Sequence, residues 1–115
     1  MSGVILTMGV AHLSRADLAP SRAVRRMVNK AMGIACTKAR DQGGIPIAAV
    51  DDLTVHSLGP WVDNFGKHLA GAASRNGVSV VGGEMAQMPD TYAAGYAGVV
   101  ISVVSLRSAP LIERE

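Results

Sequence analysis

Several segments of this chain are apolar at almost every position, and that continuity is what most constrains its fold. The longest runs from Val99 to Val104 and is interrupted only by Ser102. A strand that faces water on one side alternates apolar and polar residues, whereas a strand that is apolar on both faces needs cover on both. We therefore expect a sheet that is covered on both of its faces.

Hydrophobic spacing predicts six elements in the order β-α-β-α-β-β. One helical face is expected to carry apolar residues at three-and-four spacing, namely Val24, Met27, Val28, Ala31, Ile34 and Ala35. Prolines suit the first turn of a helix and glycines its end, and both expected helices have these signals. The expected strands span 4–7, 45–50, 78–81 and 96–106, the expected helices span 21–41 and 60–76, and residues 107–115 are expected to be a tail or a connection.

Two helices can cover only one face of a four-stranded sheet, so we expect an α/β (α+β) fold with a mixed sheet and both helices on one side. Leaving the other face in water would cost on the order of 25 cal/mol per Å² of apolar surface. A second copy of the chain is the simplest cover, which predicts a homodimer or a higher oligomer. With no linker and no repeat, residues 1–115 are expected to form a single domain.

Composition and charge argue against several classes of protein. No apolar stretch approaches the roughly 18 to 20 residues of a membrane span, so a membrane is not an expected partner. Residues 1–40 carry most of the basic side chains, but without interleaved aromatic residues this face is expected to be solvated and not to bind nucleic acid. Cys36 is the only cysteine, which fits a reducing cytoplasm. No residue spacing indicates a metal site.

The segment Gly82-Gly83-Glu84 lies between two of the apolar runs. Adjacent glycines let a backbone leave a strand by a tight turn and approach a ligand closely, and a carboxylate directly after them would lie at the mouth of the strand. Asp51 and Asp52 are likewise expected to begin the exit from the second strand. Such paired acids either bind a cation or are simply solvated.

Three blocks of the sequence resemble the aminoimidazole ribonucleotide synthetase family, the ATP-dependent cyclo-ligases of purine synthesis. Gly-Gly-Glu-Met-Ala-Gln-Met-Pro at 82–89 is similar to the family's G-G-E-x-A-x-M-P segment. Residues 7–13 resemble its T-D-G-V-G-T-K motif, and residues 43–51 resemble G-A-x-P-x-x-x-x-D. Together the blocks cover nearly the whole chain in the order found in the family's N-terminal domain.

The resemblance implies a fold, a cofactor and a set of site residues. The family's N-terminal domains pair through their sheets into a barrel, and the dimer interface helps to form the nucleotide site. Mg-ATP is therefore the implied cofactor, although the residues alone establish none. Glu84 is the residue implied to be catalytic. The residues implied to bind ligand are Gly9, His12, Asp51, Gly82, Gly83 and Glu84.

The departures from the family decide what activity we expect. Met8 stands at the position of the motif's aspartate and Leu13 at that of its lysine, and Gly95 replaces the aspartate ahead of the last strand. A magnesium–nucleotide site needs hard oxygen ligands and a cation for phosphate, which methionine and leucine do not supply. The family's second domain also has no counterpart in these residues. We therefore expect no ring closure by this chain alone.

Three interpretations follow from this pattern. The first is a truncated cyclo-ligase-like domain that retains binding of a nucleotide or another phosphorylated ligand. The second is a homo-oligomeric assembly module without small-molecule chemistry. The third is one part of a split cyclo-ligase, completed by a separate subunit that supplies the missing second domain. Whether the chain is an enzyme stays open among them.

Overall fold

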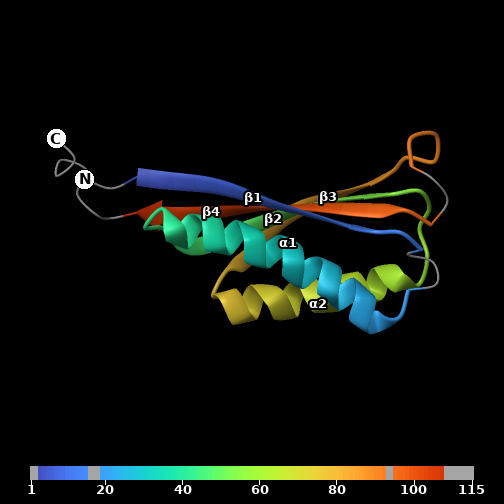
Figure 1. Ribbon diagram of the computed structural model, residues 1–115, viewed down its shortest axis with the longest axis horizontal. Coiled ribbons are helices and arrows are strands. Elements are labelled where there is room, and N and C mark those ends of the chain that lie inside the picture. The colour runs from blue at the N-terminus through green and yellow to red at the C-terminus, as the bar shows by residue number, and fades with distance from the viewer. Residues whose placement is uncertain (1–2, 16–18, 93–94, 108–115) are drawn as a thin grey trace.

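The computed structural model describes residues 3–15, 19–92 and 95–107, which form one four-stranded sheet and two helices. The chain order is β1 (Gly3–Leu13), α1 (Ser21–Asp41), β2 (Ile45–Val55), α2 (Trp61–Asn76), β3 (Ser79–Gln87) and β4 (Ala97–Arg107). Across the sheet the order is β1-β4-β2-β3; β2 and β3 are parallel, and the other neighbours are antiparallel. Figure 1 shows this arrangement.

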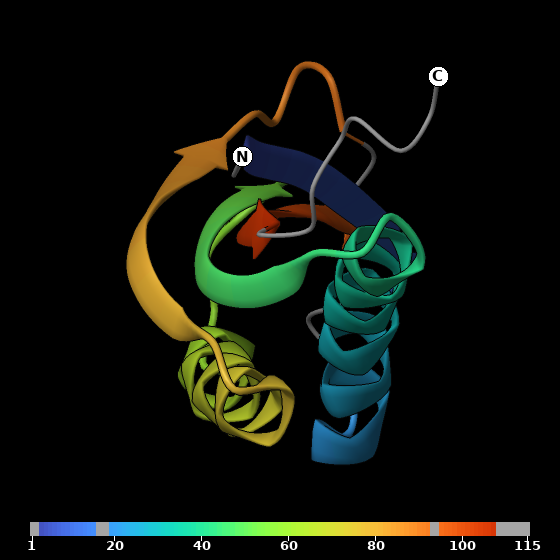
Figure 2. The same cartoon turned by 90° about the vertical axis from the view of Figure 1, so that its left-hand side faces the viewer.

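Both helices lie on the same side of the sheet, as the end-on view in Figure 2 shows. The expected fold class, the element order and the one-sided placement of the helices are confirmed. Arg107, expected to begin the tail, is instead the last residue of β4, and the rest of the expected tail lies outside the described residues.

Three strands are longer than the sequence predicted. β1 continues past Thr7 to Leu13, β2 continues to Val55, and β3 continues to Gln87. The expected exits at Asp51-Asp52 and Gly82-Gly83 are therefore wrong, because both pairs lie inside strands. Backbone pairing explains the difference: β4 has 11 residues, and pairing along its full length extends β1 and β2 through positions of low strand propensity.

Helix α1 packs very closely on β1 because the strand carries the small residues Gly9 and Thr7 beneath it. Gly9 is buried under the helix, where a Cβ atom would overlap the carbonyl oxygen of Ala31. One turn further along α1, the Thr7 hydroxyl donates a 2.7 Å hydrogen bond to the carbonyl oxygen of Ala35. The fully buried face of α1 follows the predicted spacing, except that Ile34 is only half-buried and Met32 is buried in addition. It comprises Val24, Val28, Ala31, Met32, Ala35, Cys36 and Ala39.

Helix α2 completes the core and ends at a left-handed glycine. Gly77 has φ 71° and its N–H bonds to the Ser74 carbonyl at 3.2 Å, which confirms the predicted stop signal. Trp61, Phe65 and Leu69 of α2 face the core. In the described part of the chain, no helix is long and apolar enough to cross a membrane.

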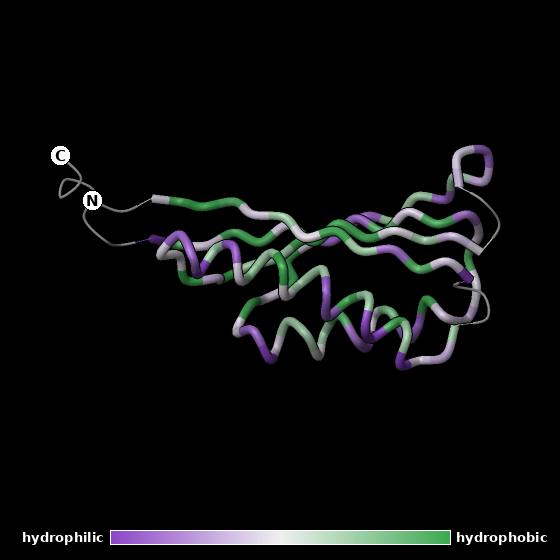
Figure 3. The backbone as a smooth tube through the Cα atoms, viewed as in Figure 1, coloured by the Kyte–Doolittle hydropathy of each residue, from purple (hydrophilic) through white to green (hydrophobic). Residues whose placement is uncertain are grey.

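The side of the sheet opposite the helices is open, and it divides into an apolar end and a polar end. The first half of β1 places alternate apolar side chains on this face, with Val4 70% and Leu6 62% exposed. Figure 3 shows how apolar this part of the sheet is. The part of the open face that we call the apolar end consists of Val4, Leu6, Met8, Ile45 and Leu106. The part that we call the polar end consists of His12, Asp52, Thr54 and Glu84.

Candidate functional site

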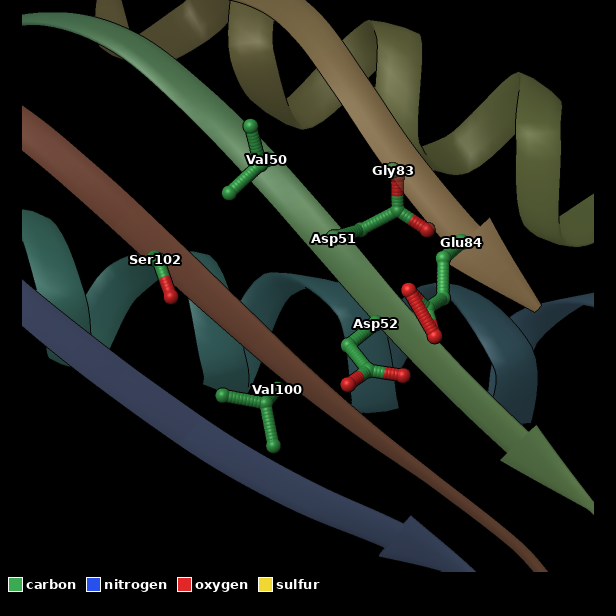
Figure 4. Close-up of a pocket in the computed structure, with 7 residues that line it drawn as sticks. All are labelled: Val50, Asp51, Asp52, Gly83, Glu84, Val100 and Ser102. Atoms are coloured by element: carbon green, nitrogen blue, oxygen red, sulfur yellow. The ribbon is translucent and has the colours of Figure 1, made fainter. Parts of the chain in front are cut away.

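The polar end brings together two carboxylates from neighbouring parallel strands. Asp52 of β2 and Glu84 of β3 are register partners, so their side chains project from the same face of the sheet. Figure 4 shows the two carboxylates next to each other. Both side chains are exposed, and they line a shallow cavity of about 360 Å³ with Val50, Val100 and Ser102.

Asp51 also lines this cavity, but its side chain lies on the other face of β2 from that of Asp52. It shares that face with the buried Ala49 and Leu53, and it is itself half-buried. Its register partner is Gly83, where a Cβ atom would overlap the Asp51 carboxylate (Figure 4). Gly83 therefore provides the space that the Asp51 side chain occupies. This is a structural reason for a glycine at position 83, independent of any ligand.

Burial raises the pKa of Asp51 above its ordinary value of 3.8. A hydrogen bond from backbone N–H opposes this shift, while repulsion from the neighbouring Asp52 adds to it. A raised pKa means that the charged carboxylate is less favourable in the folded protein than in the unfolded chain. At neutral pH the ionised Asp51 side chain therefore lowers the stability of the fold.

We expect Asp51→Asn to raise the melting temperature at pH 7 by a few degrees in the absence of ligand, because asparagine has the same shape without the charge. The gain should disappear below pH 3.8, where aspartate is protonated in both states. Thermal unfolding of both proteins from about pH 3 to pH 8 measures this difference. A gain of equal size at every pH would assign the effect to packing and not to charge.

The structure places the residues singled out in the sequence in three different locations. Asp51, Gly82, Gly83 and Glu84 come together through the pairing of β2 with β3. Gly9 lies on the helix side of β1, buried beneath α1. His12 lies near the end of β1, where it lines a separate cavity with Thr91, Tyr92 and Tyr96.

The contributions of β4 and of the two tyrosines to these cavities are not evident from any local motif. Ser102 and Val100 line the acidic cavity because β4 lies beside β2, and no local motif encodes that pairing. Tyr92 and Tyr96 follow the glycine-glycine-glutamate block and meet His12, which is about 80 positions earlier in the chain. The signal that could have found them is that these are the only two tyrosines in the chain, four residues apart.

Comparison with known proteins shows the fold at low sequence identity. No family model and no curated protein matches the sequence. Among solved structures, the thiamine monophosphate kinase of Aquifex aeolicus superposes with a TM-score of 0.69 and 20% identity over 90% of this chain. PurL of T. maritima complexed with ATP gives 0.65 and 21% identity over 91% of the chain.

This chain has a PurM-like fold, which is the fold that it shares with these proteins. A HypE–HypF complex also matches, with a TM-score of 0.65 and 17% identity over 92% of the chain. The chain spans 34% of the kinase and 16% of PurL, so it corresponds to a part of each of these proteins. At these identities the similarity shows the PurM-like architecture and does not assign an activity.

Proposed function

We propose that this PurM-like domain binds a phosphorylated ligand together with a divalent cation at the polar end of the open sheet face, and that a second copy covers the apolar end. The observation that carries the proposal is the pairing of Asp52 with Glu84 on one face, directly beside an exposed apolar surface. Neither feature contributes to the core that the two helices bury.

The two carboxylates suit magnesium bound together with phosphate better than magnesium bound alone. Among the described residues there is no group of three or more His, Cys, Asp or Glu side chains placed to hold a metal ion. Mg²⁺ is commonly held by one or two carboxylates, with phosphate oxygens and water completing its shell. Asp52 and Glu84 can supply the carboxylate share of such a shell, and the ligand would supply the phosphate.

The comparisons support a phosphorylated ligand without identifying it. One matching structure is the A. aeolicus kinase complexed with AMPPCP and TMP, which has a TM-score of 0.69 and 17% identity. The matching PurL structures include complexes with ATP and with ADP. We infer that a nucleotide is the first ligand class to test on this chain.

We propose a role related to that of the aminoimidazole ribonucleotide synthetases of purine synthesis. We also propose a cytoplasmic location, because a chain with a single cysteine fits a reducing compartment. Met8 and Leu13 replace the motif's acidic and basic residues, so the domain by itself does not complete ATP-dependent ring closure. A separate subunit that supplies a second domain would convert it into part of a split cyclo-ligase. A coupled assay with formylglycinamidine ribonucleotide and Mg-ATP should show no turnover; turnover that Glu84→Gln abolishes would overturn this.

A second candidate function is a homo-oligomeric assembly module without a small-molecule ligand. The observation that favours it is the size of the exposed apolar surface on β1, β2 and β4. Under this interpretation the protein self-associates but no nucleotide changes its stability.

We expect ADP with Mg²⁺ to raise the melting temperature of the wild-type protein, because a ligand that binds only the folded state stabilises it by mass action. Asp52→Asn combined with Glu84→Gln should weaken this binding at least tenfold, since it removes both cation ligands. Asp41→Asn combined with Asp63→Asn, which removes two charges at exposed residues of α1 and α2, is the matched control and should bind as the wild type does. Isothermal titration with and without Mg²⁺ measures the affinities.

Two results would contradict the nucleotide proposal. One is the absence of any thermal shift with ADP, ATP or AMP at millimolar concentration with Mg²⁺, which would favour the assembly module. The other is binding that the double variant leaves unchanged, which would place the ligand away from Asp52 and Glu84.

A further inference from the structure

A second cavity, of about 330 Å³, lies at the same end of the sheet as the two carboxylates. Its lining residues are His12 from β1 and Thr91, Tyr92 and Tyr96 from the connection between β3 and β4. Three of these four side chains carry planar rings. The chain holds only four Phe, Tyr and Trp residues in all, and the other two, Trp61 and Phe65, are buried in the core.

A glycine on β4 lets two of these rings come close to the sheet. A Cβ atom on Gly98 would lie 3.0 Å from the Tyr92 hydroxyl oxygen and 3.2 Å from Cδ2 of His12. Both side chains therefore extend over the bare backbone at this position. Gly98 pairs with His12 on β1 and with Thr54 on β2. It therefore lies between these two residues of the polar end, on the strand in the middle.

Backbone hydrogen bonds hold the two tyrosines in place. The Met88 N–H bonds to the Val55 carbonyl at 2.8 Å, and the Tyr92 N–H bonds to the Met88 carbonyl at 2.9 Å. The His56 N–H bonds to the Tyr96 carbonyl at 3.0 Å. Both tyrosines are thus anchored to the end of β2, and their rings meet edge to face with centroids 6.4 Å apart. This backbone restraint reduces the entropy lost when a ligand orders the two residues.

The distance from this cavity to the carboxylates matches the size of a nucleoside phosphate. Thr54 is opposite Gly98, and Asp52 lies two residues earlier on the same face of β2. Two residues along a strand span about 7 Å, and neighbouring strands are about 5 Å apart. A ring over Gly98 and a phosphate beside Asp52 would therefore be separated by roughly 8 to 9 Å.

We propose that the cavity formed by His12, Tyr92 and Tyr96 is the subsite for a planar nitrogen heterocycle, the base of a nucleotide whose phosphate and cation lie at Asp52 and Glu84. Aromatic rings attract a flat heterocycle through stacked or edge-to-face contacts. The His12 imidazole and the Tyr92 hydroxyl supply hydrogen-bonding groups for the nitrogen atoms at its edge. This inference rests on the proposed function, because the phosphate site fixes the position of the rest of the ligand.

The test uses the full chain labelled with 3-fluorotyrosine, which gives one ¹⁹F resonance for each of the two tyrosines. Adenosine without Mg²⁺ should shift both resonances in a saturable manner, whereas ribose 5-phosphate, which lacks the base, should shift neither. Tyr96→Leu removes one exposed ring and should weaken adenosine binding at least fivefold. Gly98→Ala should weaken it similarly by displacing Tyr92 and His12, and Leu58→Ala, at an exposed residue in the connection before α2, is the control.

The outcomes separate this inference from the proposed function. If ADP binds with Mg²⁺ while adenosine shifts neither tyrosine resonance up to 10 mM, the ring subsite is wrong and the phosphate site stands. The opposite outcome is that adenosine shifts both resonances, while Asp52→Asn combined with Glu84→Gln weakens the affinity for ADP no more than the affinity for adenosine. In that case the ring subsite stands and the phosphate site is wrong. Adenosine binding that Tyr96→Leu and Gly98→Ala leave unchanged would also overturn the subsite.

Discussion

Gly9→Ala is expected to destabilise the domain by about 3 kcal/mol or more, because the added methyl group has no space to occupy. The new Cβ atom would overlap the carbonyl oxygen of Ala31, lie 2.8 Å from its carbonyl carbon and lie 3.1 Å from the Ala35 nitrogen. All three are backbone atoms of α1, so no side-chain rotation relieves the overlap. The helix would have to move away from β1, which would also lengthen the Thr7–Ala35 hydrogen bond.

Chemical denaturation with circular dichroism measures this loss, and the melting temperature should fall by 10 °C or more. Gly33→Ala is the matched control within α1, since a Cβ atom there meets nothing within 4 Å. Alanine is the better helix former, so this control should gain about 0.5 to 1 kcal/mol. If Gly9→Ala melts within 2 °C of the wild type and instead loses ligand affinity, position 9 contributes to binding and the packing argument fails.

The contrast between Gly9 and Gly83 shows what the sequence could predict. Both stand in segments that resemble ligand-binding motifs, and the resemblance implies a binding role for both. The structure shows that each glycine also makes room for a neighbour: an α1 carbonyl oxygen for Gly9 and the Asp51 carboxylate for Gly83. A motif identifies a position where a side chain is not tolerated. It does not show whether protein or ligand occupies the space.

The helices were predictable to within one residue at each end because their signals are local. The buried spacing of α1 and the stop signal at Gly77 both depend on residues within one or two turns. Strand ends were not predictable in the same way. Asp52 and Glu84 have low strand propensity, yet both lie inside strands because a partner strand continues past them.

The candidate site required the register as well as the order of the strands. Parallel pairing of β2 with β3 places Asp52 opposite Glu84, and a slip of one residue would place Asp51 there instead. The two irregularities in β2 pairing, between Pro46 and Ala48 and between Ala49 and Val50, change the register within the strand. Nothing in the local sequence fixes these shifts, so the composition of the cavity follows only from the structure.

Leu6→Asp is expected to weaken self-association at least 100-fold while leaving the fold intact. Leu6 lies on the apolar end and is 62% exposed in the single chain, so an aspartate there costs little in the monomer. In a two-fold symmetric dimer the same surface meets itself, so each aspartate would lose water and face a like charge or an apolar surface. Sedimentation velocity from micromolar to about 100 µM should show a wild-type dimer and a monomeric variant.

Leu58→Asp is the matched control for this experiment, because Leu58 is 57% exposed in the connection between β2 and α2, away from the open face. It introduces the same charge at a leucine of similar exposure and should leave the dimer intact. The two variants should melt at similar temperatures at concentrations where both are monomeric. A wild-type protein that stays monomeric at 100 µM would show that the apolar end is not covered by a second copy, and a different partner would then have to bury Val4, Leu6 and Leu106.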